Sequence, residues 1–562
     1  MMAGADGSRP RSRWKRRLRR AGIVLATLVL LVCLASRAVD WVCFARPPAL
    51  EGSPPILRQQ VHEADGVLRI GPARLAKRDG IMHMYLAGDP FTLGYCHASL
   101  TRDILKEQEA ELLETIKEHV PSRIGLWLLR KYVLIRNRDL PDHVAPRFQM
   151  EMLGLTMGSE DPFPEIGHLY HRVLNYHAAH DIAHAVMGLP MVGCTSFAAW
   201  GEATRDGHLL IGRNFDFDAG PGFDERKSVA RVVPDEGFGY VSVAWPGLIG
   251  VVTGLNDAHL FISINAARST DTRRIGTPVS LVMREVMQHA STIQEGVRII
   301  EGSTVFVSDC YLLADGKTGR AVIVEKTPSR CSVLQPEGCF LVSSNHFVTD
   351  RLKDDSANTD YMAEGTTLTR YDRITELLSS RREPLTPADV AGLLRDRAVK
   401  GMPAPSLGHP AAVNSLATTH SVVVDATAGV IWVSAGPHQL GAYVPFGLDS
   451  FGQPADAEAI GADPMLTDGS LERAREAKTL LMQAADLVDD GDSEEARRRL
   501  RRAVDLNPVW YAPHLGLGQI ALDCGEWDEA REHLRTAQEL CPAFGTERER
   551  LRALLARAAG RR

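Results

Sequence analysis

The sequence predicts a layered α+β protein with an apolar helix near its N-terminus and a small all-α repeat module at its C-terminus. Three observations predict this class. Short runs rich in Val, Ile, Leu and Phe are separated by blocks of helical periodicity, one apolar run follows a basic start, and one pattern recurs 34 residues later near the end. The 562 residues exceed what one hydrophobic core usually contains, and so several units are expected.

The N-terminus combines a basic cluster with an apolar run. Lys and Arg crowd residues 1–20, and residues 21–44 are mostly apolar. Positive charge before an apolar helix holds that end in the cytoplasm. We therefore expect a basic cytoplasmic segment (1–20), a membrane anchor (21–44) and a proline-marked tether (45–60), with the rest of the chain on the periplasmic or extracellular side. A cleaved secretory signal is the alternative.

Composition excludes several function classes. With 64 Lys and Arg against 70 Asp and Glu, the net charge is -6, which argues against nucleic-acid binding by the whole chain. The nine cysteines include no Cys-x-x-Cys pair, which argues against a structural zinc or a thioredoxin-type site. Phosphate-binding and dinucleotide-binding motifs are missing, and we expect no cofactor. The proximity of Cys310, Cys331 and Cys339 leaves one disulfide open.

Residues 61–193 have mainly helical periodicity after a short strand-like opening. Within them, His177, His180, Asp181 and His184 have the three- and four-residue spacings that share one helix face, which raises a metal-site hypothesis. Polar helix surface or packing is the stronger interpretation, because the His-Glu-x-x-His pattern is missing. We therefore expect no metal.

The pattern changes to strands after Cys194. Strands are expected at 208–217, 238–245, 260–265, 310–314, 321–325 and 340–344, with a hairpin over 421–435. Helices are expected at 278–289, 367–378 and 387–395. Strands grouped between blocks of helix predict layers of α and β structure within a core over residues 194–455.

A loose linker (456–472) leads to a repeat over residues 473–562. The repeat consists of small, large and proline positions: Gly491, Ala496, Leu500, Ala503 and Pro508 recur as Gly525, Ala530, Leu534, Ala537 and Pro542. This period is typical of tetratricopeptide helix hairpins. Two repeats are too few to stand alone, so we expect them to dock on the main domain or on another subunit and to serve a protein partner or self-association.

Two short motifs carry the candidate chemistry. Gly193-Cys194-Thr195-Ser196 offers a thiol, which attacks carbonyl carbon only as a thiolate and so needs a base. The stretch 212–216 follows with an arginine and an aspartate. These motifs, preceded by the glycine- and proline-marked segment 88–97, resemble the N-terminal-nucleophile hydrolases of the penicillin acyltransferase and choloylglycine hydrolase type.

The resemblance implies a four-layer αββα sandwich in which Cys194 opens a central strand. It also implies that the precursor cuts itself between Gly193 and Cys194, so that 61–193 would be the N-terminal part of the precursor. A freed α-amino group has a pKa of roughly 7.7 to 8 and can act as base for its own thiol.

The resemblance also assigns site residues. Cys194 is the expected nucleophile, and Arg213 and Asp216 contact it and its amine. Asn265 is expected to donate to the oxyanion, with Asn256 as a rival. Asn345 matches a second active-site asparagine. Arg370 matches a late active-site arginine, with Arg373 as the alternative.

The leading functional hypothesis is an amide hydrolase or acyltransferase that forms a thioester on Cys194. Its substrate would be a small linear or cyclic acyl-amide, or an acyl-coenzyme A donor. A papain-like pair of Cys194 with His420 or His346 is a second hypothesis. A membrane-anchored scaffold with an inactive hydrolase domain is a third.

Overall fold

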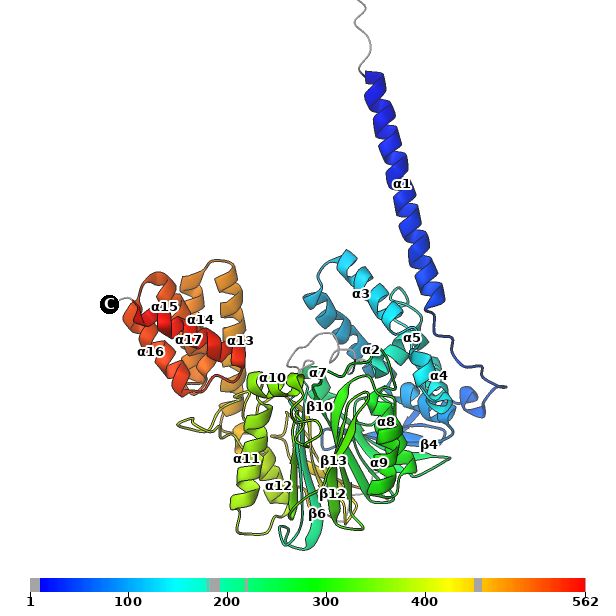
Figure 1. Cartoon of the computed structure of the whole chain (residues 1–562). Coiled ribbons are helices and arrows are strands. Elements are labelled where there is room, and N and C mark those ends of the chain that lie inside the picture. Colours follow the sequence, from blue (N-terminus) through cyan, green and yellow to red (C-terminus); the bar gives the residue numbers. More distant parts are fainter. Residues whose placement is uncertain (1–10, 179–180, 182–192, 218–220, 449–456, 561–562) are drawn as a thin grey trace, which may run out of the picture.

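The computed structural model describes residues 11–178, 181, 193–217, 221–448 and 457–560 (Figure 1). Its core contains two β-sheets. The larger has the order β1 (His62–Ala64), β2 (Val67–Ile70), β3 (Ala73–Arg78), β4 (Ile81–Gly88), β7 (Ser228–Pro234), β8 (Tyr240–Ala244), β9 (Thr253–Asn256), β10 (Leu260–Ala267), β11 (Ser308–Asp315), β12 (Arg320–Lys326) and β13 (Cys331–Leu334). The smaller has the order β14 (Phe340–Ser343), β5 (Thr195–Gly201), β6 (Gly207–Asp216), β15 (Thr418–Asp425), β16 (Val430–Ser434) and β17 (Tyr443–Gly447).

The two sheets pack face to face, and alternation along β6 shows how. Leu209 and Ile211 join a buried cluster that includes Leu312 of the larger sheet, whereas Leu210 points the other way. Successive side chains of a strand point to opposite faces, so β6 is buried on both sides. This double burial explains why its sequence is an almost continuous apolar run.

Helices cover both outer faces. On the larger sheet lie α8 (Val279–His289), α9 (Ile293–Gly302), α2 (Pro90–His119), α4 (Pro146–Gly158) and α5 (Leu169–His177). On the smaller sheet lie α11 (Thr367–Ser380) and α12 (Pro387–Leu394), which pack against Leu210 and Val423. The predicted four-layer αββα sandwich is confirmed. Among the described residues, this part also contains α3 (Arg123–Arg136), α7 (Pro221–Glu225), α10 (Ser356–Glu364), η1 (Pro55–Arg58) and η2 (Leu140–His143).

The strand-like opening before the helices is longer than the sequence suggested. It forms β1 to β4, and β4 pairs in parallel with β7, so residues before Cys194 complete the larger sheet. Asp89 caps α2 by accepting from the Thr92 main-chain nitrogen, and Pro90 occupies the first turn. A Cβ added at Gly94 would overlap the carbonyl oxygen of Glu151, so α2 and α4 cross at backbone contact.

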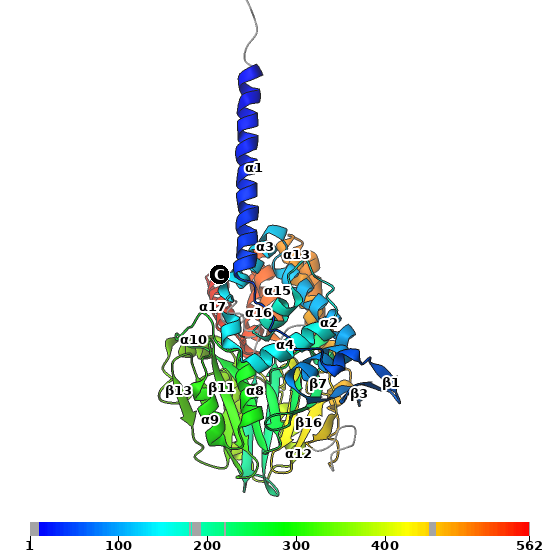
Figure 2. The same cartoon turned by 90° about the vertical axis from the view of Figure 1, so that its right-hand side faces the viewer.

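Helix α1 (Arg11–Val42) extends away from the body in both views (Figures 1 and 2). Its residues 17–42 include an 18-residue stretch with a mean hydropathy of 2.3, so this part of the helix is long and apolar enough to cross a membrane or to act as a signal sequence. Lys131 of α3 binds Asp40 near the end of α1 at 2.6 Å. This ion pair links the base of α1 to the helical layer.

The C-terminal module contains α13 (Ser470–Asp489), α14 (Ser493–Leu506), α15 (Tyr511–Cys524), α16 (Trp527–Glu539) and α17 (Gly545–Ala559), preceded by η3 (Pro464–Leu466). Gly491 lies just after α13 and Gly525 just after α15. Their φ values of 86° and 79° are in the left-handed region, where glycine is favoured at helix ends. The module docks on the core: Asn507 Nδ2 donates to the Leu407 carbonyl at 3.0 Å, and His409 Nε2 lies 3.0 Å from the Cys541 carbonyl oxygen. The expected docking on the main domain is therefore present.

Candidate active site

Cys194 lies directly before β5, an interior strand of the smaller sheet, and is fully buried. Thr195 pairs with Asn214 of β6, and the Gly193 main-chain nitrogen donates to the Asp216 carbonyl oxygen at 3.1 Å. The ladder between the two strands thus continues through the Gly193–Cys194 peptide. This pairing places the two sequence motifs side by side.

Asp216 ends β6 with its carboxylate beside Gly193. A Cβ added at Gly193 would lie 3.4 Å from Asp216 Oδ2. The carboxylate accepts from Thr418 Oγ1 at 2.6 Å and from Ser415 Oγ at 3.5 Å. Burial raises the pKa of Asp216 to about 6, against the opposing effects of Arg370 and the two hydroxyls. The group is therefore a carboxylate near neutral pH and a stronger base than an exposed aspartate.

Arg370 reaches the site from α11. Its Nη1 donates to the Cys194 carbonyl oxygen at 2.5 Å and to Thr195 Oγ1 at 2.7 Å. Its Nη2 donates to Asn345 Oδ1 at 2.9 Å. The planar guanidinium thereby fixes the main chain of Cys194 and the amide of Asn345 together. Arg373 instead binds Asp396 at 2.8 Å, and this ion pair raises its pKa.

Arg213 lies on β6 between the two sheets. Its guanidinium donates to the Val252 carbonyl at 2.5 Å and also to Thr253 Oγ1 and the Ile264 carbonyl. Burial lowers the pKa of Arg213 to about 10, opposed by the nearby Cys194 sulfur. In turn, burial raises the pKa of the Cys194 thiol, while Arg213 and Arg370 lower it. The thiol needs a base in spite of these cations.

The two predicted asparagines are both buried near Cys194. Asn265, on β10, accepts from Ser196 Oγ at 3.2 Å and donates to Ser343 Oγ at 3.1 Å. Asn345 Nδ2 donates to the Ala266 carbonyl at 2.9 Å. Each asparagine therefore bridges the two sheets beside the nucleophile strand.

The rival Asn256 has a different position. Its Nδ2 donates to the Met287 and Ala290 carbonyls, and its Oδ1 accepts from the nitrogens of Ala258 and Leu260. It therefore stabilises a turn.

Several site residues were not singled out in the sequence. Ser344 Oγ donates to the Cys194 carbonyl oxygen at 3.2 Å, and Thr367 Oγ1 donates to Ser344 Oγ at 3.0 Å. Thr418 and Ser415 hold Asp216. Hydroxyl residues are common throughout the chain, and only the packing of distant segments selects these four. The one sequence signal for any of them is the run Ser343-Ser344-Asn345, which places Ser344 beside a predicted site residue.

The two histidines of the papain-like hypothesis have partners other than Cys194. His420 pairs with Phe215 across β15 and β6, stacks on its ring at 5.0 Å, and places Nε2 2.9 Å from Thr253 Oγ1. Burial lowers its pKa well below the usual value. His346 Nδ1 lies 2.9 Å from Thr367 Oγ1, and burial lowers its pKa to about 4.

Across the described ranges, no group of three or more His, Cys, Asp and Glu side chains is placed to hold a metal ion. His177 Nε2 accepts from the Ile249 nitrogen, and Asp181 accepts from the Val279 nitrogen. His180 and His184 lie outside the described residues. All nine cysteines are described, and each is a free thiol.

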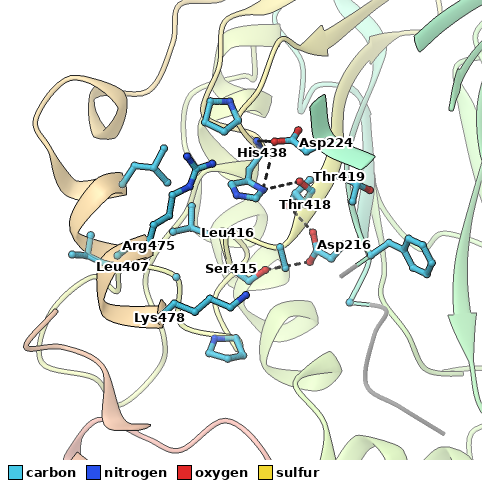
Figure 3. A pocket seen from close by; sticks show the side chains of 18 of the residues that line it. Asp216, Asp224, Leu407, Ser415, Leu416, Thr418, Thr419, His438, Arg475 and Lys478 are labelled. Carbon is cyan, nitrogen blue, oxygen red and sulfur yellow. Dashed lines mark hydrogen bonds and ion pairs between the residues drawn. The ribbon is translucent and has the colours of Figure 1, made fainter. Parts of the chain in front are cut away.

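A cavity of about 760 Å³ opens onto Gly193, Asp216 and Arg370. The hydrolase core supplies one side, including Thr418 and His438, and the repeat module supplies the facing side through α13 (Figure 3). Much of the remaining lining is apolar: Phe217, Leu407, Leu416, Leu471, Trp510 and Phe544. The site therefore has room for a small organic substrate beside the Gly193–Cys194 bond.

Comparison with known proteins gives matches over two parts of the chain. Residues 203–438 match the family model of acyl-coenzyme A:6-aminopenicillanic acid acyl-transferase, and residues 481–543 match a tetratricopeptide repeat model. The first match includes Arg213, Asp216, Asn265, Asn345 and Arg370 and begins after Cys194.

Two curated relatives each align over 251 residues, or 42% of this chain. An uncharacterized protein of Archaeoglobus fulgidus is 28% identical, and 41% of its length is covered. The N-acylethanolamine-hydrolyzing acid amidase of Caenorhabditis elegans is 24% identical, and 66% of its length is covered. The chain thus spans less than two thirds of either relative.

Solved structures also match at low similarity. The Caenorhabditis elegans orthologue of N-acylethanolamine-hydrolyzing acid amidase matches with a TM-score of 0.30 and 20% identity, over 42% of this chain and 93% of that one. A conjugated bile acid hydrolase from Clostridium perfringens matches with a TM-score of 0.31 and 12% identity, over 47% and 97%. By the family models, residues 203–438 of this chain are similar to the acyl-coenzyme A:6-aminopenicillanic acid acyl-transferase family, and residues 481–543 are similar to tetratricopeptide repeats.

Proposed function

We propose that this chain is an autoprocessed cysteine N-terminal-nucleophile enzyme that hydrolyses or transfers acyl groups of small amides through a thioester on Cys194. One observation carries the proposal. The Gly193–Cys194 peptide lies against the Asp216 carboxylate and the Arg370 guanidinium at the wall of a substrate-sized cavity.

The first step is self-cleavage. The Cys194 sulfur attacks the Gly193 carbonyl carbon, the peptide C–N bond breaks, and a thioester links Gly193 to the sulfur. Asp216 takes the thiol proton and returns it to the leaving nitrogen, a role suited to its raised pKa of about 6. Water then hydrolyses the thioester, which frees the Gly193 carboxylate, the thiol and a new α-amino group.

The freed amine is the base of the catalytic cycle. With a pKa of roughly 7.7 to 8 it can take the thiol proton near neutral pH. The thiolate attacks the substrate carbonyl, the substrate amine leaves with the proton, and water or another amine accepts the acyl group. Arg213 favours the thiolate electrostatically, and Arg370 and Asp216 hold the nucleophile residue in place.

The amides of Asn265 and Asn345 are the proposed donors to the oxyanion. An amide donates without titrating, so the site keeps this function over a wide pH range. Both are buried and already held by neighbours that fix their direction. Because the base is the chain's own amine, the proposed reaction uses no cofactor or metal.

The proposed substrate is a small acyl-amide, linear or cyclic, with acyl-coenzyme A as an alternative donor. The apolar lining of the cavity suits an acyl chain, and one relative's name refers to N-acylethanolamine hydrolysis. We place the catalytic part outside the cytoplasm, anchored by α1, because a basic segment precedes the apolar helix. Protease protection in intact cells tests this orientation, and N-terminal sequencing separates an anchor from a cleaved signal.

Intact-mass measurement and N-terminal sequencing test the core proposal. Wild-type protein should yield a fragment that begins with Cys194, and Cys194→Ala protein should remain uncut. Cys310→Ala is the matched control, since that thiol is also fully buried but donates to the His346 carbonyl at 3.5 Å. Active enzyme with an intact Gly193–Cys194 bond would overturn the proposal. Trapping of an acyl group on Cys194 with an amide panel tests the thioester.

A further inference from the structure

One helix of the repeat module forms a wall of the cavity. Leu471, Ala474, Arg475 and Lys478 of α13 all line it. Their spacing of three, four and seven residues places them on one face of the helix. The tetratricopeptide module therefore presents a continuous helical face to the cavity that opens onto Gly193 and Asp216.

This wall is held in place by the hydrolase core. Leu471 packs with Leu440 of the core and with Met465 in a buried cluster. Farther along, Tyr511 packs with Val399 and Ala412 in a second shared cluster. Burial of apolar side chains across the junction fixes the module against the core. The α13 face is thus part of the cavity in the folded chain.

The wall carries two cations at its solvent-exposed part. Arg475 and Lys478 are exposed, and Figure 3 shows both side chains extending from α13 toward the core side of the cavity, where His438, Thr418 and Asp216 lie. Burial is the largest cause that lowers the pKa of the His438 imidazole, and the nearby Arg475 guanidinium lowers this pKa further. Arg475 therefore acts on a group inside the cavity.

The acidic residue nearest His438 is already paired. Asp224 binds Lys227 at 2.5 Å and accepts from the His438 main-chain nitrogen at 2.7 Å. Both partners of this ion pair are almost completely buried. The charge of Asp224 is therefore largely compensated by Lys227.

We propose that α13 is a specificity wall of the active site and that Arg475 and Lys478 bind an anionic group, a carboxylate or phosphate, on the amine part of the acyl-amide substrate. The apolar residues Leu416, Trp510 and Phe544 receive the acyl chain. Guanidinium and ammonium groups bind oxyanions through charge-assisted hydrogen bonds. The inference rests on the proposed function, since it names the substrate class of the same site, and it gives the repeats a role beyond partner binding.

The test compares three substrates with one acyl chain: N-lauroylglycine, N-lauroyl phosphoethanolamine and the neutral N-lauroylethanolamine. The full chain is compared with Arg475→Gln/Lys478→Gln. We expect kcat/KM for the preferred anionic substrate to fall about tenfold through KM, and that for the neutral substrate to change less than about twofold. Added salt should weaken the anionic preference of the wild type.

The matched control is Arg535→Gln/Arg552→Gln, which removes the same charge from exposed positions on α16 and α17 outside the cavity lining. It should keep the anionic preference. Equal losses for all three substrates in the α13 variant, or equal effects in variant and control, would overturn the inference. Circular dichroism and the melting temperature check that each variant is folded.

Binding by calorimetry separates this inference from the proposed function. The three amides are titrated into full-length Cys194→Ala protein, with and without the α13 substitutions, so no turnover is needed. Selective anion binding that disappears in the α13 variant supports the inference even if wild-type protein neither cuts itself nor turns over any amide. Turnover without a preference for anionic substrates would support the proposed function and contradict the inference about α13.

Discussion

The Arg370 guanidinium lies 2.5 Å from the carbonyl oxygen of Cys194, although 176 residues separate them in the chain. Helix α11 packs on the outer face of the smaller sheet, and from there Arg370 reaches the start of β5. The contact fixes the main chain at the proposed cleavage point. It also explains how a cation far along the hydrolase segment reaches the candidate site at Cys194.

Replacing Arg370 with Lys tests this relationship. The ammonium keeps the charge but cannot reproduce the planar fork that holds the Cys194 carbonyl and Asn345 together. A buried charge-assisted hydrogen bond contributes about 1.5 to 3 kcal/mol, so we expect self-cleavage to slow by about 10- to 100-fold. A time course of fragment formation measures this rate. Arg373→Lys, on the same helix but paired with Asp396, should leave the rate unchanged. Equal slowing in both variants would contradict the assignment.

Asp216 should make stability depend on pH. Its pKa in the folded chain is about 6, above the value of roughly 3.9 in an unfolded chain. Between these values the folded state binds more protons, so the free energy of unfolding falls as pH rises from about 4 to 6. The pKa difference corresponds to about 3 kcal/mol, and this contribution to stability is fully present only below about pH 4.

Urea unfolding of Cys194→Ala protein at pH 4 and pH 7 measures this effect. In the Asp216→Asn variant the fall should be smaller by that amount. In the Thr418→Val variant the pH range over which stability falls should extend to higher pH, because the lost hydroxyl favoured the charged Asp216 carboxylate. If Asp216→Asn leaves the pH dependence unchanged, the buried carboxylate has been misassigned.

Substitution of the histidines separates the two cysteine mechanisms. His420→Gln and His346→Gln should each retain self-cleavage and turnover to within about tenfold, because a base supplied by the chain's own amine needs neither imidazole. Both rings are held by threonine hydroxyls, Thr253 and Thr367 respectively. Steady-state rates over pH 5 to 9 are the measurement. A loss of about 1000-fold or more from one substitution in a folded protein would favour the papain-like pair.

The crossing of α2 and α4 should tolerate no side chain at Gly94. A Cβ there would overlap the Glu151 carbonyl, and backbone on both sides leaves little room to adjust. We expect Gly94→Ala to lower the free energy of unfolding by about 3 kcal/mol. Gly392→Ala is the control, because its Cβ meets nothing within 4 Å, and it should stabilise by about 0.5 to 1 kcal/mol. Thermal unfolding and the soluble yield compare the two variants. Equal melting temperatures and yields would show that α2 and α4 are not in backbone contact at Gly94.

Local pattern determined much of this architecture. The apolar runs over 208–217 and 260–265 became β6 and β10, because strands buried on both faces need apolar residues throughout. Period and glycine position likewise predicted the repeats, since each helix hairpin needs a small residue at its crossing and a glycine at its end. The order of Gly193, Cys194, Arg213 and Asp216 indicated the candidate site, because neighbouring antiparallel strands bring nearby segments together.

Tertiary packing alone decided the rest. Helical periodicity left Arg370 and Arg373 as alternatives, and the orientation of α11 on the sheet places the first at Cys194 and the second at Asp396. The partners of Asp216 come from a loop and a strand about 200 residues later. No local signal marks α13 as a cavity wall. Such contacts depend on how separately formed layers pack, and residue spacing along one chain does not encode that geometry.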